Sequence, residues 1–168
     1  ELEFVPALIL ELGADAAERF ITYFTNNIRN PNTRRAYHRW VLYFFDWCDR
    51  TGLDFKAVKS FHVSAFIEGL MSVQAREIVP EKRDEGPYGK SSVKQALAAI
   101  RMLYDWLIIG QVSAVNPAHA VRGPKLVVTK GLTPLLDDDE MAQLLNSVDT
   151  SDVVGLRDRA LIGIMVYT

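Results

Sequence analysis

The residues of this sequence best suited to chemistry are basic side chains, which fall in stretches that contain no acid. Residues 29–39 hold four arginines and one histidine, and two further acid-free stretches follow. The basic residues of the three stretches are Arg29, Arg34, Arg35, His38, Arg39, Lys90, Lys94, Arg101, His119, Arg122, Lys125 and Lys130. The acids gather instead in residues 1–18 and 137–158, and the net charge is −2. This segregation predicts one positive face for a nucleic acid, the alternative being ordinary solvated helix surface.

No set of side chains with the spacing of a catalytic or metal site is found. The three histidines, His38, His62 and His119, lie far apart in the sequence and lack the short spacing of helical zinc ligands. The acidic run 137–140 is better explained by helix capping than by metal binding. Glycine-rich phosphate loops and nucleophile elbows are missing from the sequence. We therefore predict no catalytic residue, no metal site and no cofactor.

Composition places the chain among soluble globular proteins. Hydrophobic residues make up 49% of the 168 positions, which is enough for a core. Cys48 is the only cysteine, so no intrachain disulfide can form, and its place on an apolar helix face predicts a buried thiol. No apolar run approaches the roughly 18 residues of a membrane span, and no signal peptide opens the chain. We expect a cytoplasmic protein without a membrane partner.

Hydrophobic spacing predicts an all-α fold, because apolar residues recur with helical rather than strand periodicity. We expect helices at about 14–27, from Asn32 or Thr33 to Arg50, from about Ser60 to Met71, and from Ser91 or Ser92 to Ile109. The inner positions expected for the second helix are Tyr37, Trp40, Val41, Phe44, Phe45 and Cys48. Those expected for the fourth helix are Val93, Leu97, Ile100, Tyr104 and Leu107. An exposed loop is expected at 80–89, between two helical hairpins.

These helices should carry the basic residues on their outer sides. Arg34, Arg35, His38 and Arg39 are expected opposite the inner positions of the second helix, near its positive N-terminal end. Lys94, Arg101 and Asp105 share an outer stripe of the fourth helix with Ala98, a small residue between the two cations that would let a flat partner come close.

Glycine and proline at both ends of residues 122–134, with Lys125 and Lys130 between them, predict an extended basic linker. Asp137 and Glu140 have the spacing of a capping box for a helix to about Asn146, and another helix is expected from Val154. We therefore expect a helical domain at 1–121, the linker at 122–134, and the start of a second domain at 135–168. The chain is expected to be a fragment of a longer protein.

Three groups of residues resemble the tyrosine recombinase, or phage integrase, family. Thr33 to Tyr37, followed by Trp40, Phe44, Trp47 and Cys48, resembles a helix of that family's core-binding, SAM-like domain. A second group, Ser92 to Leu107 with Gly110 and Asn116 to Ala118, resembles the last helix of that domain and the Asn-Pro pair that follows it. The run Gly155 to Ile162 resembles the opening of the family's catalytic domain. Together, in this order, these groups cover nearly the whole chain.

The resemblance implies a SAM-like bundle of four to five helices, followed by a linker and the first helices of a truncated catalytic domain. It also implies binding of double-stranded DNA by the residues Arg34, Arg35, His38, Arg39, Lys90, Lys94, Gln95, Arg101, Lys125 and Lys130. Gln95 and Arg101 are the candidates for reading bases. The parent protein would cut and rejoin DNA through a 3'-phosphotyrosine intermediate, without metal or nucleotide, as a tetramer of protomers on two duplexes. This chain has no residue to match the family's catalytic ones and should be inactive alone.

Two alternatives and one further expectation stay open. The main alternative is a non-catalytic helical adaptor that binds protein, which would show no salt-dependent affinity for DNA. A self-contained enzyme is disfavoured because no catalytic set is found. The apolar residues within 156–168 should pack on the N-terminal domain or on a second copy of the chain.

Overall fold

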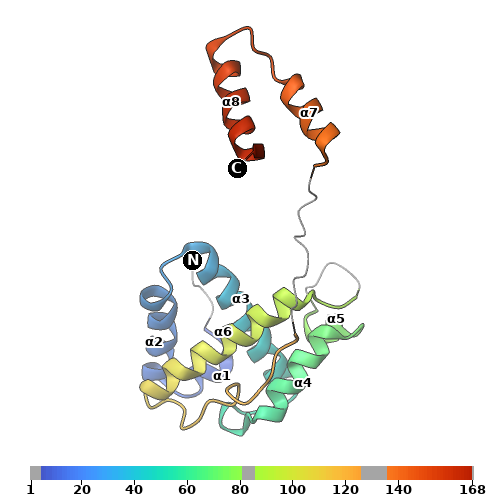
Figure 1. Cartoon of the computed structure of the whole chain (residues 1–168). Coiled ribbons are helices and arrows are strands. Elements are labelled where there is room, and N and C mark those ends of the chain that lie inside the picture. Colours follow the sequence, from blue (N-terminus) through green and yellow to red (C-terminus); the bar gives the residue numbers. More distant parts are fainter. Residues whose placement is uncertain (1–4, 81–85, 126–135, 168) are drawn as a thin grey trace. The chain divides into compact units, whose positions relative to one another are not determined.

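The computed structural model describes residues 5–80, 86–125 and 136–167, except for the side chains of 166 and 167. Helices are the only regular elements in these ranges, so the prediction of an all-α fold is confirmed. The chain divides into two compact units, residues 1–126 and residues 127–168 (Figure 1). The predicted domains 1–121 and 135–168, and the predicted linker between them, stay predictions. No helix in the described ranges is long and apolar enough to cross a membrane.

The first unit contains four longer helices and several single turns. The longer helices match the four expected from the sequence, whereas the short helices α1 and α5 were not expected. The elements are α1 (Ala7–Leu10), α2 (Ala14–Thr22), the π-helix η1 (Tyr23–Asn27), α3 (Pro31–Arg50), the 3₁₀-helix η2 (Phe55–Ala57), α4 (Ser60–Met71), α5 (Ala75–Ile78) and α6 (Lys90–Ile109). Residues 117–120, after α6, form turns rather than a helix.

The N-cap of helix α3 lies two residues before the first of its two expected caps. The Asn30 side chain, rather than that of Asn32 or Thr33, accepts hydrogen bonds from the backbone N–H groups of Asn32 and Thr33, at 2.9 and 3.3 Å. Pro31 occupies the first helical position, where its missing N–H would have no intrahelical partner anyway. Asn30 is therefore the N-cap of α3, and Pro31 is its first helical residue.

Helix α6 is the centre of the first unit, because it packs against α2, α3 and α4 (Figure 1). Its five expected inner residues are all buried, as are Trp40, Phe44 and Cys48 of α3. Aromatic rings from different helices meet in this core; those of Phe44 and Phe66, for example, meet edge to face at 5.2 Å. Met71, the last residue of α4, is 38% exposed.

The second unit is a pair of helices, α7 (Asp138–Ser147) and α8 (Val153–Tyr167). The expected capping box of α7 is confirmed: Asp137 accepts from the Glu140 backbone N–H at 2.8 Å, and Glu140 accepts from that of Asp137 at 3.0 Å. In the turn before α8, Asp149 accepts from the Ser151 N–H at 2.9 Å. No described side chain of this unit is buried.

Candidate nucleic-acid interface

Helix α6 presents its basic residues to solvent because its apolar side chains are held in the core. Lys90 and Lys94 are exposed, in the first two turns of the helix. Arg101, two turns further on, is only half-buried. The outer stripe expected for this helix therefore holds two freely presented ammonium groups and one guanidinium that lies closer to the protein.

The Arg101 guanidinium binds the chain that follows α6. Its Nε donates to the carbonyl oxygen of Ala118 at 3.3 Å, and one terminal nitrogen donates to that of Val121 at 2.8 Å. Asn116 binds the same helix, because its amide donates to the Arg101 carbonyl at 2.9 Å and to the Asp105 carboxylate at 2.6 Å. These bonds fold residues 116–121 back along α6.

The returning chain forms two adjacent hollows against α6, which share Arg101 and Gly123. Lys94 and Lys125 line one of them, and His119 and Arg122 line the other. Gly123 allows the chain to come this close, since a Cβ there would lie 3.2 Å from a methyl carbon of Leu97. Among the described residues that line these hollows, none is acidic. Residues about thirty positions apart in the sequence thus form one basic surface.

The basic residues of α3 are less uniform than the sequence indicated. Arg35 and Arg39 are exposed, as expected. Arg34 is half-buried, and its guanidinium donates to the carbonyl oxygens of Ile28, at 2.8 and 3.0 Å, and of Thr25, at 3.3 Å. The expectation that Arg34 projects away from the fold was therefore wrong, because its guanidinium satisfies carbonyls left without partners at the end of η1.

His38 is likewise turned toward the protein. Its ring lies edge to face on Phe24, with centroids 5.0 Å apart, and 6.1 Å from the ring of Phe20. It is half-buried between α3 and the preceding helix. On this part of α3, Arg35 and Arg39 are the two cations of the predicted set that stand fully in solvent.

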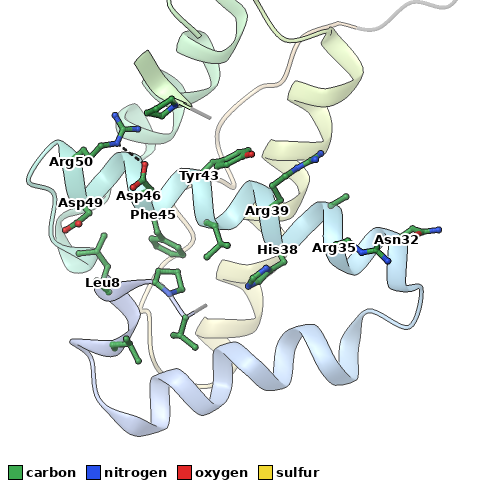
Figure 2. A pocket seen from close by; sticks show the side chains of 17 residues that line it. Leu8, Asn32, Arg35, His38, Arg39, Tyr43, Phe45, Asp46, Asp49 and Arg50 are labelled. Atoms are coloured by element: carbon green, nitrogen blue, oxygen red, sulfur yellow. Dashed lines mark hydrogen bonds and ion pairs between the residues drawn. The ribbon is translucent and has the colours of Figure 1, made fainter. Parts of the chain in front are cut away.

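A long groove runs along α3 beside the N-terminal segment of the chain (Figure 2). Asn32, Arg35 and Arg39 stand toward the N-terminal end of the helix, and Asp46, Asp49 and Arg50 toward its other end. The Arg50 guanidinium is paired with Asp46 at 2.8 Å and donates to the carbonyls of Glu77 and Ile78. Only the N-terminal half of this groove therefore has the charge to attract an anion.

Trp40 connects the basic residues of α3 with those of α6. Its indole N–H donates to the side-chain oxygen of Gln95 at 3.0 Å. The Arg39 guanidinium lies over the same indole ring, 5.8 Å from its centroid, within the range of a cation–π contact. Arg39, Gln95 and Lys94 therefore lie along one continuous surface across the two helices.

The reactive groups of the described chain are poorly placed for catalysis. Burial raises the pKa of the Cys48 thiol to about 12, and burial likewise raises the pKa values of Tyr23 and Tyr104. Three or more metal-ligating side chains do not cluster anywhere in the described ranges. Lys130 and most of the predicted linker lie outside the described residues, so the placement of Lys130 stays a prediction.

Sequence reasoning missed the residues that build this surface without carrying its charge. Asn116 and Gly123 shape the chain that returns along α6, and Trp40 holds Gln95. The one available signal was the Asn-Pro pair at 116 and 117, where an amide side chain can bond its own backbone.

This helical bundle is a phage integrase N-terminal SAM-like domain, whose family profile matches residues 17–110. The chain is 31% identical over 155 residues to a tyrosine recombinase XerC of Xanthomonas campestris pv. campestris, covering 89% of this chain and 44% of that protein. The XerC of Xanthomonas axonopodis pv. citri is 32% identical over 149 residues (88% and 47%), and that of Escherichia coli O139:H28 is 27% identical over 155 residues (88% and 45%). The chain belongs to the phage integrase, or tyrosine recombinase, family.

The chain spans a little less than half the length of these curated relatives. No solved structure gives a significant match to it.

Proposed function

We propose that this chain binds double-stranded DNA as the DNA-binding part of a site-specific tyrosine recombinase. The observation that carries the proposal is the gathering of Lys94, Arg101 and Lys125 around one hollow beside Gly123, whose described lining contains no acidic residue. A protein with an overall charge of −2 would not be expected to attract DNA. A local basic surface can do so, because phosphate contacts depend on nearby cations and salt screens distant charges.

The proposed DNA contacts differ between side chains that are exposed and side chains that are already bonded to backbone carbonyls. Lys90, Lys94, Lys125, Arg35 and Arg39 are exposed and bind phosphates, as does Lys130. Arg34 and Arg101 shape the surface through their carbonyl bonds, and the guanidinium N–H groups left over from those bonds face the DNA. His38 lies at the edge of the α3 contact, and Gln95 reads a base.

The parent protein is proposed to cut and rejoin DNA through a 3'-phosphotyrosine intermediate, in an assembly with other recombinase protomers. The support is family membership together with the run Gly155 to Ile162, which resembles the start of the catalytic domain and forms part of α8. The intact recombinase is proposed to act as a tetramer on two duplexes.

The first experiment is fluorescence anisotropy of this chain on random-sequence duplex DNA over a series of salt concentrations. Neutralisation of about six phosphates should give a slope of log affinity against log salt of about −5. A slope near zero, or no binding at low salt, would contradict the proposal.

Matched variants locate the surface. Lys94→Gln and Lys125→Gln should each weaken binding and make the salt slope shallower by about one unit, because each removes one phosphate contact. Lys56→Gln is the control, since Lys56 is an exposed lysine of η2 that lines neither hollow. An equal loss of affinity in all three variants would show that only the net charge matters.

The groove along α3 favours a second candidate function, a helical adaptor that binds protein. Its lining includes Leu8, Leu42 and Tyr43 beside both acidic and basic side chains, a mixture typical of surfaces that bind peptides. This function predicts no salt-dependent affinity for DNA, so the anisotropy series separates the two candidates.

Self-association through residues 156–168 is proposed for α8. Leu156, Leu161, Ile164 and Met165 are all more than half exposed within the described chain, and such apolar surface tends to find a partner. Sedimentation should show a dimer that Leu161→Asp with Ile164→Asp converts to monomer. A wild-type chain that sediments as a monomer would contradict a second copy as the partner.

A further inference from the structure

One side chain of the basic surface, that of Gln95, has its orientation set by a neighbour. Gln95 is exposed on α6, next to Lys94, and its side-chain oxygen lies 3.0 Å from the indole nitrogen of Trp40. An indole N–H can only donate, so the amide atom facing it must be the oxygen. The usual ambiguity between the two ends of a glutamine amide is thereby removed.

Trp40 is itself held in place. Its side chain is 2% exposed, and its ring meets those of Tyr43 and Tyr88 edge to face, with centroids 5.8 and 5.1 Å apart. Tyr88 is in turn anchored by its backbone N–H, which donates to the Leu70 carbonyl at 2.8 Å. The indole is therefore a fixed donor, and the Gln95 amide cannot turn over without leaving that donor unsatisfied.

The other end of the amide is left for a partner outside the chain. Among the described residues, no acceptor is bonded to the Gln95 amide nitrogen, which carries two N–H donors. We propose that Gln95 is a specificity-determining residue that donates its amide N–H to an acceptor on a base edge, held in that orientation by Trp40. The inference rests on the proposed binding of DNA.

The fixed orientation has a consequence for base choice. In the major groove, guanine, adenine and thymine each present an acceptor on their own strand, whereas cytosine presents only the donor N4–H₂ there, and the acceptors of its base pair lie on the paired guanine of the other strand. A glutamine that could turn its amide would accept from cytosine as readily as it donates to the other bases. Gln95 as oriented by Trp40 should instead disfavour cytosine at the position it reads.

The test is selection of duplexes with a randomised segment by this chain, followed by sequencing of the bound fraction. The wild-type chain should deplete cytosine at one position by about threefold to tenfold, the value of one hydrogen bond lost and one donor left unsatisfied. Gln95→Glu keeps an acceptor for the Trp40 indole but presents an acceptor to DNA, so the same position should become enriched in cytosine.

Gln95→Met is the uncharged control for Gln95→Glu, because it removes the amide without adding a negative charge. It has a side chain of similar length without a hydrogen-bonding amide, so it should show no preference at that position while keeping the wild-type preference elsewhere. Identical selected sequences for wild type, Gln95→Glu and Gln95→Met would overturn the inference.

The role of Trp40 is tested separately. Trp40→Phe should let the Gln95 amide turn over, so that cytosine is tolerated while overall affinity is retained. Because Trp40 is buried, a second measurement keeps the test open if this variant does not fold. Hydrogen exchange of the Trp40 indole N–H should be at least about tenfold slower in wild type than in Gln95→Met; equal rates would show that no such bond orients the amide.

The outcomes separate this inference from the proposed function. Salt-dependent binding with no base preference that responds to Gln95 would leave the proposed function standing and overturn the inference. Absence of binding at low salt would overturn both.

Discussion

The two units of this chain both consist of helices, but side chains are buried between helices in the first unit and not among the described residues of the second. In residues 1–126, side chains of α2, α3, α4 and α6 form one continuous core. In residues 127–168, α7 has a full capping box and both helices are well formed, yet none of the described side chains is buried. Local signals such as caps are therefore sufficient to begin a helix, whereas a core needs enough helices to surround apolar side chains.

The largest expected effect comes from removing a ring of the first unit's core. Phe44→Ala should lower the free energy of unfolding by about 3–5 kcal/mol, because Phe44 is 0% exposed and packs on Phe66 and Trp47. Leu161→Ala in α8, where the side chain is 52% exposed, should change it by about 0.5 kcal/mol or less. Urea denaturation followed by circular dichroism, which reports the helices of both units, measures both effects; equal losses would erase the difference between the units.

A smaller effect is expected where the first unit holds its C-terminal segment. Arg101→Met should cost about 1–3 kcal/mol, since it removes the donors to the carbonyls of Ala118 and Val121, and it should also weaken DNA binding. Lys94→Met is the control, because Lys94 is exposed and its side chain makes no hydrogen bond within the described chain, so it should lower affinity without changing stability. If Arg101→Met unfolds at the wild-type urea concentration, the segment is held by packing and by the Asn116 hydrogen bonds rather than by Arg101.

The core of the first unit also contains a hydroxyl group, that of Tyr104, whose removal should stabilise the fold. The Tyr104 hydroxyl is buried without a hydrogen-bond partner in the described chain, and such a group carries an uncompensated loss of solvation. Tyr104→Phe should therefore raise the free energy of unfolding by about 1 kcal/mol. Tyr104→Leu, which also removes ring contacts with Phe55 and Phe45, should lower it. A destabilised Tyr104→Phe protein would mean that the hydroxyl does have a partner.

The smallest effect is a pH dependence confined to the second unit. The backbone N–H and hydroxyl of Ser151 hold the pKa of Asp149 below its ordinary value. A carboxyl with a lowered pKa in the folded state stabilises that state above its ordinary pKa, and the contribution is lost as pH falls through the lowered value. Circular dichroism of the wild type should therefore show a small loss of helix on acidification that Asp149→Asn, which does not titrate, lacks. Identical acid profiles would assign that loss to other carboxyls.

Much of the first unit could be predicted from its sequence, because long helices repeat their apolar residues. The five inner positions expected for α6 are buried, and so are most of those expected for α3. The short helices α1 and α5 have four residues each, too few for a periodic pattern to show. The start of α3 was misplaced because Asn30, Asn32 and Thr33 are all suitable caps, and only Pro31 at the first helical position decides between them.

In the candidate site too, properties set by neighbouring residues could be predicted from the sequence, whereas contacts between distant segments could not. Residue types and charge spacing by themselves determined that the chain is all-α, that three basic stretches lie between two acidic ones, and that Asp137 caps a helix, since each property depends on neighbours a few positions away. Only the tertiary structure decided that Arg34 and Arg101 bind carbonyls, that Lys94 and Lys125 share a hollow, and that Trp40 orients Gln95. Those outcomes depend on distances between segments far apart in the chain, which are set by how the helices pack and which no local pattern records.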